Sequence, residues 1–379
     1  MTPPPPRVLI IGTGLIGTSI ALALRERGTE VWLSDLDPEA AKMAAGLGAG
    51  TVVPHLRDAK GIADVAVLAM DPNAVADVLA LAQGWGIADW YTDVASVKSL
   101  PVAQARARGC DLRTYVPGHP MAGREQHGPG AARADLFLGR TWALCPLPET
   151  SQDAVAVVSA LASACGADVV TTDAVTHDGW VALISHAPHV VAAAMAARLG
   201  TPSVSADALR LAGQGLRDTT RIAAGDTALW TQILAANAQP VAEVLAAVAA
   251  DLAEVADALA LAPADPASPA APASSPADIS EMSVVSRLLD RGRAGVARIP
   301  GKRGDTERAF AVVQVVIADQ LGELARLFGA AGAAGVNVED VRIEHSPGHP
   351  TGVAELSVRP DQVDALVDAM AAGGWSARR

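Results

Sequence analysis

Cysteine is scarce in this chain of 379 residues, and its few occurrences form no pattern. Cys110, Cys145 and Cys165 are widely separated, without the spacing of metal ligands, and their number is odd. Such a set argues against a disulfide framework. We therefore expect ordinary reduced thiols.

Positive charge is also in short supply. Lysine and arginine number 29 against 41 aspartate and glutamate residues, so the formal net charge is -12 and the pI is near 5.1. Nucleic acids and anionic membranes attract proteins through a basic surface field. We expect neither as a partner, whereas a small anionic ligand can still bind through a few local arginines.

Two further patterns are missing. The start, MTPPPPRVLI, has no cationic segment followed by a long apolar run and a small-residue cleavage site, as a secretory leader would have. We also find no apolar stretch of membrane-spanning length. Both absences favour a cytoplasmic protein. Half of the residues are hydrophobic, and the chain length predicts about two or three domains.

Short aliphatic runs alternate with helical patterns over residues 1–150. The runs expected to form strands, each long enough for burial on both faces of a parallel sheet, are RVLIIG, EVWLSD, DVAVLAM, WYTDVAS and TWALCPL. Segments rich in alanine and leucine separate the first three. This α/β alternation predicts a Rossmann-type, doubly wound sheet in a dinucleotide-binding domain.

The rest of the chain is organised differently. Over residues 151–262 the strand signals stop, and Ala-rich stretches with helical spacing predict an all-helical second domain. Residues 263–305 begin with a Pro/Ala/Ser segment that has little to bury, so we expect a flexible linker and a connecting segment. Residues 306–379 follow the order strand, helix, strand, strand, helix and closing strand, which predicts a ferredoxin-like α+β domain.

A glycine motif, GTGLIG, stands directly between the first expected strand and the first expected helix. Gly12, Gly14 and Gly17 permit a tight turn, close approach of a pyrophosphate and close packing of helix on strand. Leu15 and Ile16 would open the helix, whose first N–H groups attract an anion. We expect these five residues to bind a dinucleotide.

An acidic residue supports this interpretation. The second expected strand ends at Asp35, about 20 residues beyond the last glycine, as the dinucleotide fingerprint requires. A carboxylate there accepts hydrogen bonds from the adenosine ribose and repels a 2'-phosphate, so NAD is favoured over NADP. Neighbouring loop geometry can still admit NADP, and a plain glycine turn is the alternative to a cofactor site.

The expected catalytic residues follow later strands, because ligands of such sheets bind at the carboxyl ends of the strands. TDVASVKS is one such end and carries Ser96 and Lys98, and the loop YVPGHPMAG carries His119. A histidine on a rigid Gly/Pro loop beside a nicotinamide is suited to act as a general base for an alcohol. A surface histidine with no role is the alternative.

Three more histidines lie in THDGWVALISHAPH. His186 and His189 share a helix face, and Pro188 should disturb the local hydrogen bonding. Because no cysteine or carboxylate cluster completes a ligand set, we expect no metal. One or two of these histidines are expected to donate to an anionic substrate, with a capped or core position as the alternative for His177.

Arginines follow in GQGLRDTTRIAAGDTALW. Arg217 and Arg221 lie beside glycines and suit bidentate binding of a carboxylate, whereas an ordinary solvated helix end is the alternative. We expect Trp230 to be a packing residue, at a subunit contact or within the domain.

Taken in order, GTGLIG, DVASVKS, GHPMAG, ISHAPH and RDTTRIAAGDTALW resemble the prephenate and arogenate dehydrogenases of tyrosine biosynthesis, from residue 7 to about residue 262. The resemblance implies a helical substrate and dimerisation domain, and hence a homodimer. It implies that His119 is the catalytic base, that Ser96 orients this base and the substrate hydroxyl, and that Arg221 binds a substrate carboxylate. His189 is implied in binding near the substrate ring, with His186 as a second candidate.

The implied reaction is the NAD-dependent oxidative decarboxylation of prephenate to 4-hydroxyphenylpyruvate. Arogenate, which would give tyrosine, is the alternative substrate, and we favour prephenate as the commoner bacterial activity that the resemblance implies. A 3-hydroxy acid dehydrogenase would usually place a catalytic lysine in the second domain, but residues 151–262 contain no lysine. A non-catalytic sensor of NAD and amino acids is a further alternative.

The C-terminal segment VVIADQLGELARLFGAAGAAGVNVEDVRIEH resembles an ACT domain, a small regulatory unit that binds amino acids. The matching positions are Asp319 and Gly322 at a strand-to-helix turn and Asn337 after the helix, while Gln320 departs from a frequent proline. The resemblance implies feedback regulation by tyrosine. A stability or oligomerisation module is the alternative.

Overall fold

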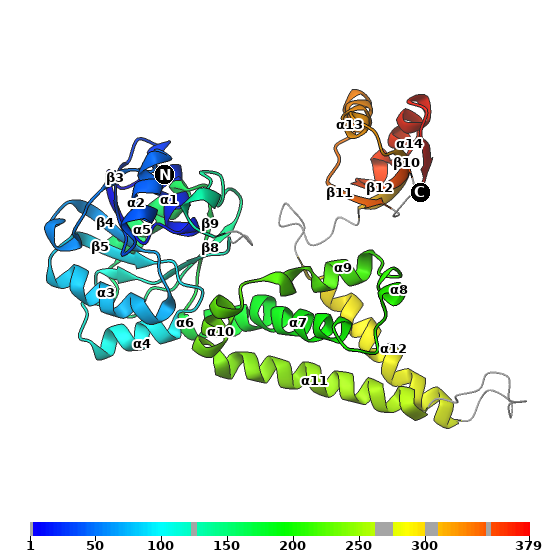
Figure 1. Ribbon diagram of the computed structural model, residues 1–379, viewed down its shortest axis with the longest axis horizontal. Coiled ribbons are helices and arrows are strands. Elements are labelled where there is room, and N and C mark those ends of the chain that lie inside the picture. The colour runs from blue at the N-terminus through cyan, green and yellow to red at the C-terminus, as the bar shows by residue number, and fades with distance from the viewer. Residues whose placement is uncertain (1–2, 123–126, 262–275, 300–309, 346–349) are drawn as a thin grey trace, which may run out of the picture. The chain divides into compact units, whose positions relative to one another are not determined.

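The computed structural model describes residues 3–122, 127–261, 276–299, 310–345 and 350–379 (Figure 1). The chain divides into two compact units, Met1–Ala249 and Ala250–Arg379. The predicted Pro/Ala/Ser linker lies mostly outside the described residues.

The first unit is built around a six-stranded parallel sheet in the order β3-β2-β1-β4-β5-β6. Its strands are β1 (Arg7–Ile11), β2 (Glu30–Ser34), β3 (Thr51–Val52), β4 (Ala63–Leu68), β5 (Ala88–Asp93) and β6 (Tyr115–Val116). The helices around it are α1 (Leu15–Arg25), α2 (Pro38–Gly46), α3 (Pro72–Gly84), α4 (Ser99–Ala107) and α5 (Gln152–Ala164). The strand order reverses between β1 and β4, and this switch point is where such sheets bind ligands.

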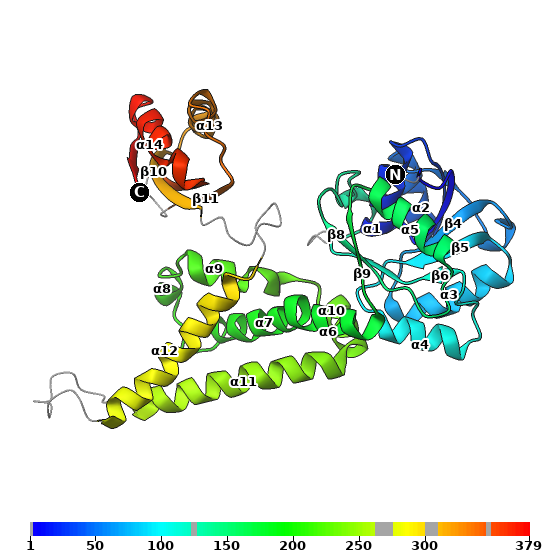
Figure 2. The same ribbon diagram turned by 180° about the vertical axis from the view of Figure 1, so that it is seen from behind.

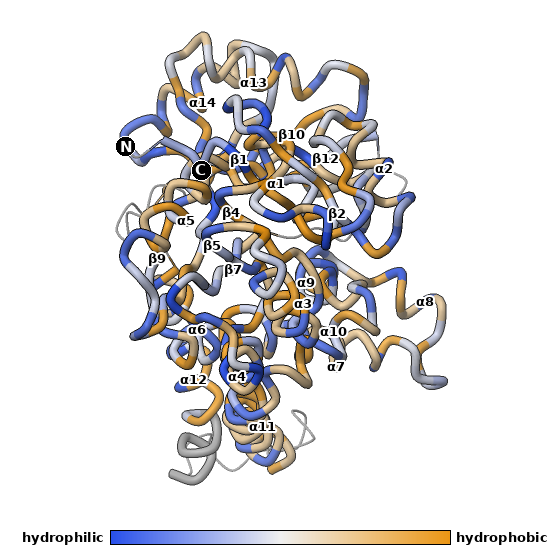
Figure 3. The backbone as a smooth tube through the Cα atoms, turned by 90° about the vertical axis from the view of Figure 1, so that its left-hand side faces the viewer, coloured by the Kyte–Doolittle hydropathy of each residue, from blue (hydrophilic) through white to orange (hydrophobic). Residues whose placement is uncertain are grey.

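Burial on both faces of this sheet explains its continuous aliphatic strands. Along β1, Val8 and Ile10 belong to one core cluster with residues of α1 and α5, whereas Leu9 and Ile11 belong to another with residues of α3. Figure 3 traces the hydropathy of each residue along the backbone. The predicted doubly wound α/β domain is therefore confirmed.

A second, three-stranded sheet lies beside the first. It contains β7 (Gly118–Pro120), β8 (Thr141–Leu144) and β9 (Asp168–Thr171), with β8 antiparallel to β7 and parallel to β9. The prediction that TWALCPL joins the parallel sheet was therefore wrong. Buried strands of any sheet have the same aliphatic appearance, so the sequence pattern could not distinguish the two sheets.

The N-terminal fold continues past residue 150, where the sequence predicted an all-helical domain to begin. Val158 and Leu161 of α5 are buried in the same core cluster as β1, and β9 is a strand. An amphipathic helix pattern shows which face is buried but not which domain the helix packs against, so α5 was assigned to the wrong side of the boundary.

The helical part of this unit begins after β9. It comprises α6 (Ala174–Val181), a π-helix (Ala182–His186), α7 (Ala187–Leu199), α8 (Ala206–Leu209), α9 (Gln214–Thr220), a 3-10 turn (Arg221–Ala224), α10 (Thr227–Ala236) and the first half of α11 (Ala238–Leu261), which continues into the second unit. Pro188 has no N–H to donate to the preceding turn. The wide turn next to it, where the N–H of Ala187 donates to the carbonyl of Ala182, is the disturbance that the sequence predicted.

The helical run Ala174–Leu199 is long and apolar enough to cross a membrane, by length and composition only. The expectation that no stretch reaches that length was therefore wrong for this run. Within it, His177, Asp178 and His186 are buried and hydrogen-bonded. The core helix of a globular domain passes the same test.

In the second unit, α12 (Pro276–Val296) runs beside the end of α11 (Figures 1 and 2). Arg287 pairs with Glu254 at 3.3 Å and Arg291 with Asp251 at 2.6 Å. Most of the segment assigned to linker and connection, where it is described, is thus one helix.

The C-terminal elements follow the predicted order. They are β10 (Ala311–Ala318), α13 (Glu323–Ala333), β11 (Asp340–His345), β12 (Thr351–Val358), α14 (Val363–Ala372) and β13 (Ser376–Arg378). The four strands form an antiparallel sheet in the order β11-β12-β10-β13. Leu327 of α13 and Leu366 of α14 are fully buried against it, so this part has a hydrophobic core of its own.

Candidate active site

The three glycines of the first turn differ in the space around them. Gly12 has a φ of 102°, and a Cβ there would lie 2.1 Å from the carbonyl oxygen of Ala69. A Cβ on Gly17 would lie 2.0 Å from the carbonyl oxygen of Gly12. A Cβ on Gly14 would meet nothing within 4 Å, so open space adjoins this residue.

This open space lies at the N-terminus of α1. Gly14 is the cap residue, Leu15 and Ile16 form the start of the helix, and no side chain caps it. The first N–H groups of a helix and its positive dipole end suit a phosphate group. The predicted cofactor residues therefore form a cradle that fits a pyrophosphate.

Asp35 follows β2 and is fixed against the glycine turn. One carboxylate oxygen accepts hydrogen bonds from the backbone N–H and the hydroxyl of Thr13, the latter at 2.8 Å. The other oxygen accepts from the N–H of Asp37 at 2.9 Å. The carboxylate is thus hydrogen-bonded to the residue that separates the first two glycines of the turn.

His119 lies in the middle of β7, in register with Ala143 of β8, rather than in an irregular loop. It is half-buried. Its Nδ1 lies 3.0 Å from Nε2 of His177, and the two rings meet edge to face with centroids 5.1 Å apart. The structure therefore brings together two histidines that are far apart in the sequence.

His177 leads on to a carboxylate. Its Nδ1 lies 2.9 Å from an oxygen of Asp178, and both residues are 2% exposed. Asp178 also accepts the backbone N–H groups of Lys98 and Ser99, each at 2.8 Å. From the sequence, His177 was one of three histidines that could bind an anionic substrate, and a capped or core position was its alternative. The aspartate directly after it was the one available signal of a further role.

The strand that carries His119 is anchored by a buried ion pair. The side chains of Lys98 and Asp93 are fully buried and paired. Lys98 also donates to the carbonyl oxygen of Gly118 at 2.6 Å, and the hydroxyl of Tyr115 donates to Asp93 at 2.6 Å. These bonds tie the end of β5 to the residue before His119.

The surroundings keep His119 neutral. Burial lowers the pKa of His119 well below its usual value of 6.5, and the electrostatic influence of the neighbouring His177, Lys98 and His186 lowers the pKa further. For Asp178, burial raises the pKa, but hydrogen bonds from His177, Ser99 and Lys98 outweigh it and lower the pKa below its usual value. At neutral pH, the imidazole of His119 is therefore uncharged, and the carboxylate of Asp178 is anionic.

His186 is buried and hydrogen-bonded to Asn237. The amide of Asn237 donates to Nδ1 of His186 at 3.1 Å and to the carbonyl oxygen of Asp178 at 2.8 Å. Burial lowers the pKa of His186 to about 4. Because its Nδ1 accepts from Asn237, the ring carries its proton on Nε2.

His189 stacks on Trp230, with ring centroids 3.6 Å apart and planes 16° apart, and burial lowers its pKa. A Cβ on Gly225 would lie 2.6 Å from Nε1 of Trp230 and 3.0 Å from Cε1 of His189, so this glycine leaves room for the stack. The indole also meets His186 edge to face at 6.2 Å. Trp230 thus packs between the two histidines, as a packing residue should.

The remaining predicted site residues are Arg217, Arg221 and Ser96. Arg217 and Arg221 are exposed, on α9 and the following 3-10 turn, which both pack against α7. Ser96 is half-buried between β5 and α4. Among the residues that the structure describes, no group of three or more His, Cys, Asp or Glu side chains is arranged to hold a metal.

Comparison with known proteins identifies the family to which this fold belongs. The family model described as prephenate dehydrogenase, nucleotide-binding domain, matches residues 20–171, and the dimerization-domain model of the same family matches residues 173–265. The change from one model to the other coincides with the junction of β9 and α6.

Individual relatives extend the match. The probable prephenate dehydrogenase NovF of Streptomyces niveus is 39% identical over 374 residues, which are 97% of this chain and 98% of the relative. The prephenate dehydrogenase of Bacillus subtilis (strain 168) is 32% identical over 243 residues, 62% of this chain and 65% of the relative. A crystal structure of A. aeolicus prephenate dehydrogenase with hydroxyphenyl propionate and NAD+ has the same fold, with a TM-score of 0.65, 24% identity and coverage of 78% of this chain and 98% of that chain. This chain belongs to the prephenate dehydrogenase family.

Proposed function

We propose that the protein catalyses the NAD-dependent oxidative decarboxylation of prephenate to 4-hydroxyphenylpyruvate. One observation carries this proposal. His119, which its surroundings keep neutral, comes shortly after the last strand of the parallel sheet, and the turn after the first strand of that sheet has space for a dinucleotide. A neutral imidazole and a hydride acceptor are the two components that oxidation of an alcohol requires.

The cradle residues fit NAD. The open space beside Gly14 admits the pyrophosphate, and the carboxylate of Asp35 suits the two ribose hydroxyls while it repels a 2'-phosphate. When bound, NAD supplies the hydride acceptor for the substrate carbon. Ser96, in the loop after β5, is assigned to orient His119 and the substrate hydroxyl.

His119 performs the proton chemistry. It takes the proton of the substrate hydroxyl as C4 loses its hydride, so that a dienone forms. The dienone accepts the electron pair of the bond to the ring carboxylate, which leaves as carbon dioxide, and the ring becomes aromatic. The phenolate oxygen then takes the proton back from His119. The reaction therefore releases no net proton, and the same imidazole acts first as base and then as acid.

The substrate carries two carboxylates, which need cationic or hydrogen-bonding partners. We assign Arg221 and Arg217 to the carboxylates because guanidinium groups bind them in a bidentate manner. His189, which stacks on Trp230, is assigned to the substrate ring, and His186, which meets the same indole edge to face, is the second candidate. Because residues 173–265 match a dimerization domain, we also propose a homodimer.

The test is NADH formation at 340 nm with purified protein, NAD and either prephenate or arogenate. We expect rapid reduction of NAD when prephenate is the substrate. Reduction with arogenate alone would replace the substrate but keep the mechanism, and no reduction with either would favour a non-catalytic sensor. His119→Asn should abolish turnover while the Kd for NAD stays unchanged, because the cradle is separate from the base.

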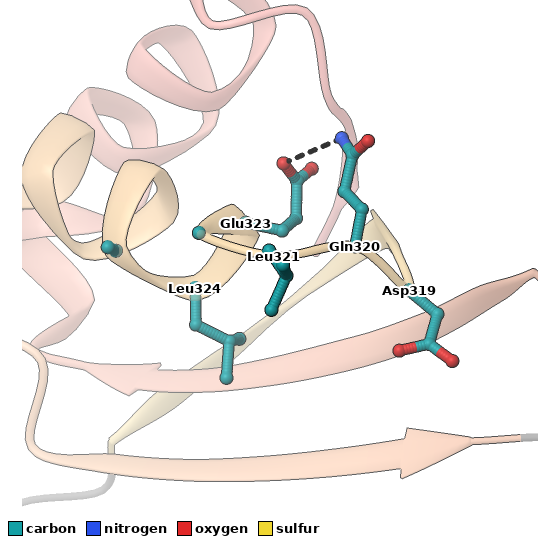
Figure 4. A pocket seen from close by; sticks show the side chains of 7 residues that line it. Asp319, Gln320, Leu321, Glu323 and Leu324 are labelled. Carbon is teal, nitrogen blue, oxygen red and sulfur yellow. Dashed lines mark hydrogen bonds between the residues drawn. The ribbon is translucent and has the colours of Figure 1, made fainter.

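We further propose that residues 306–379 form an ACT-type regulatory domain that binds tyrosine. A pocket at the turn between β10 and α13 supports this; its lining residues are Asp319, Gln320, Leu321, Gly322, Glu323, Leu324 and Ala325 (Figure 4). Gly322 has a φ of 83°, which favours glycine. Asn337 donates to Glu339 at 2.6 Å and is not among the lining residues.

Tyrosine at millimolar concentration should slow the initial rate of NADH formation if this assignment holds. Asp319→Ala should relieve that inhibition without a change in the uninhibited rate, because Asp319 belongs to the pocket of the other unit. Initial rates that do not respond to tyrosine would instead indicate a stability or oligomerisation module.

A further inference from the structure

His119, His177 and Asp178 form a continuous line of hydrogen bonds, which we call the triad. The distances are 3.0 Å from Nδ1 of His119 to Nε2 of His177 and 2.9 Å from Nδ1 of His177 to Asp178. His177 and Asp178 are each 2% exposed, so bulk water does not compete for these bonds.

Asp178 fixes one end of the triad as an acceptor. Its two oxygens receive the backbone N–H groups of Lys98 and Ser99, each at 2.8 Å, in addition to the bond with His177. Hydrogen bonds from several N–H donors stabilise the anionic form of a carboxylate. An ionised carboxylate can only accept, so the nitrogen of His177 that faces it must donate.

This constraint passes along the line to the base. A neutral imidazole that donates from Nδ1 has a bare Nε2. The bare Nε2 of His177 faces Nδ1 of His119, so that Nδ1 must carry the proton. The proton-free nitrogen of His119 is therefore Nε2, which faces away from the triad.

The triad also stabilises the charge that forms during the reaction. When His119 accepts a proton at Nε2, its ring becomes a cation whose Nδ1–H already donates to His177. Asp178 provides a counter-charge one ring further on, and no group has to reorient. A carboxylate that orients a histidine and stabilises its protonated form performs the same task in serine hydrolases.

From this geometry we propose that His177 and Asp178 are positioning residues, which fix the tautomer of His119 so that Nε2 is the atom that takes the substrate proton. The proposal deepens the proposed function and rests on it, since the tautomer matters for turnover only if His119 is the base. It assigns a role to a histidine–aspartate pair that is otherwise a buried polar contact.

The first test is Asp178→Asn. The asparagine can offer an N–H to His177, which reverses the direction of donation and leaves the proton of His119 on Nε2. We expect kcat to fall on the order of 100-fold or more, while KM and the Kd for NAD change less than about threefold. An unchanged kcat in the folded variant would overturn the proposal.

A second pair of variants acts on the middle residue and applies even if Asp178→Asn does not fold. In His177→Gln the side-chain oxygen can accept the proton of His119 Nδ1, whereas His177→Leu offers no acceptor. We expect the glutamine variant to keep a kcat at least about tenfold above that of the leucine variant. Equal kcat values for the two variants would indicate that His177 only fills space.

Asp173→Ala is the matched control. Asp173 is also a carboxylate of this segment, and it caps the N-terminus of α6 by accepting from the N–H of Thr176 at 2.9 Å. Removal of the cap should lower Tm and leave kcat unchanged. A loss of kcat similar to that of Asp178→Asn would show that any disturbance of α6 has this effect, which would overturn the specific role.

The tautomer itself can be measured without substrate. In protein labelled with 15N-histidine at pH 7, the nitrogen shifts of His119, assigned by comparison with His119→Asn, should show a protonated Nδ1 and a bare Nε2. A protonated Nε2 would overturn this inference even in an active enzyme. Absence of NADH formation together with the expected tautomer would instead overturn the proposed function alone.

Discussion

The ammonium group of Lys98 lies 2.6 Å from the carbonyl oxygen of Gly118, the residue directly before His119. The backbone N–H of the same lysine donates to Asp178 at 2.8 Å. Lys98, in the loop after β5, therefore holds both the strand that carries His119 and the helix that carries His177 and Asp178.

Replacement of Lys98 by methionine should destabilise the fold and slow turnover. It leaves the fully buried carboxylate of Asp93 without its cation, a change that costs about 3 kcal/mol or more. It also removes the hydrogen bond to the carbonyl oxygen of Gly118, so that His119 is less firmly positioned. We therefore expect both kcat and the free energy of unfolding to decrease. Urea unfolding and initial rates measure the two effects.

Lys42→Met provides the comparison for that prediction. Lys42 pairs with Glu39 at 2.8 Å, but both side chains are mostly exposed. Exposed ion pairs contribute little to stability. A loss of stability in this variant as large as in Lys98→Met would contradict the importance of burial.

Substitution by alanine should affect NAD affinity at one glycine of the first turn and stability at another. Gly14→Ala places a methyl group in the open space of the cradle, so the Kd for NAD should rise about tenfold or more while stability changes by about 1 kcal/mol or less. Gly17→Ala places a Cβ 2.0 Å from the carbonyl oxygen of Gly12 and should lower Tm strongly. Calorimetric NAD titrations and thermal unfolding distinguish the two, and unaltered NAD affinity in Gly14→Ala would argue against the cradle.

The pH profile of kcat/KM should stay flat from pH 8 to below pH 6.5. The proposed base, His119, must be neutral to accept the substrate proton, so activity is present above its pKa and is lost as the pH falls through that value. Because burial and the electrostatic influence of His177, Lys98 and His186 place this pKa well below 6.5, the acidic limb lies below that value. An acidic limb centred at or above pH 6.5 would mean that His119 is not the group observed.

His186 should make stability depend on pH. Its pKa is about 4 in the folded protein against 6.5 as the usual value, so the unfolded chain binds the proton first as the pH falls. The free energy of unfolding is therefore fully maintained above pH 6.5 and decreases towards pH 4, by up to about 3 kcal/mol from this buried residue.

His186→Asn isolates that contribution, because an asparagine oxygen can still accept the hydrogen bond from Asn237. Urea unfolding at pH 7 and at pH 4.5 should show a smaller loss of stability in this variant than in the unaltered protein. His189 and His119 also have lowered pKa values and affect both proteins equally. Identical losses in the two proteins would contradict the assignment to His186.

Local pattern accounts for the parts that were predicted correctly. The β1 strand, the glycine turn, α1 and Asp35 are nearly contiguous, so strand period, backbone freedom and spacing were sufficient to predict the dinucleotide-binding fold and NAD as its cofactor. The aliphatic strands revealed burial on both faces, and turn residues revealed the order of the C-terminal elements. In each case the physical cause acts between residues close in sequence.

The sequence by itself thus determined the dinucleotide fold, the identity of His119 as a candidate base and the succession of elements. Only the tertiary structure decided that β8 leaves the parallel sheet, that α5 and β9 complete the first domain, and that His177 lies 3.0 Å from His119 across 58 residues of sequence. The reason is physical: a buried strand or histidine has the same local pattern whatever it packs against, and only the packed fold selects its partner.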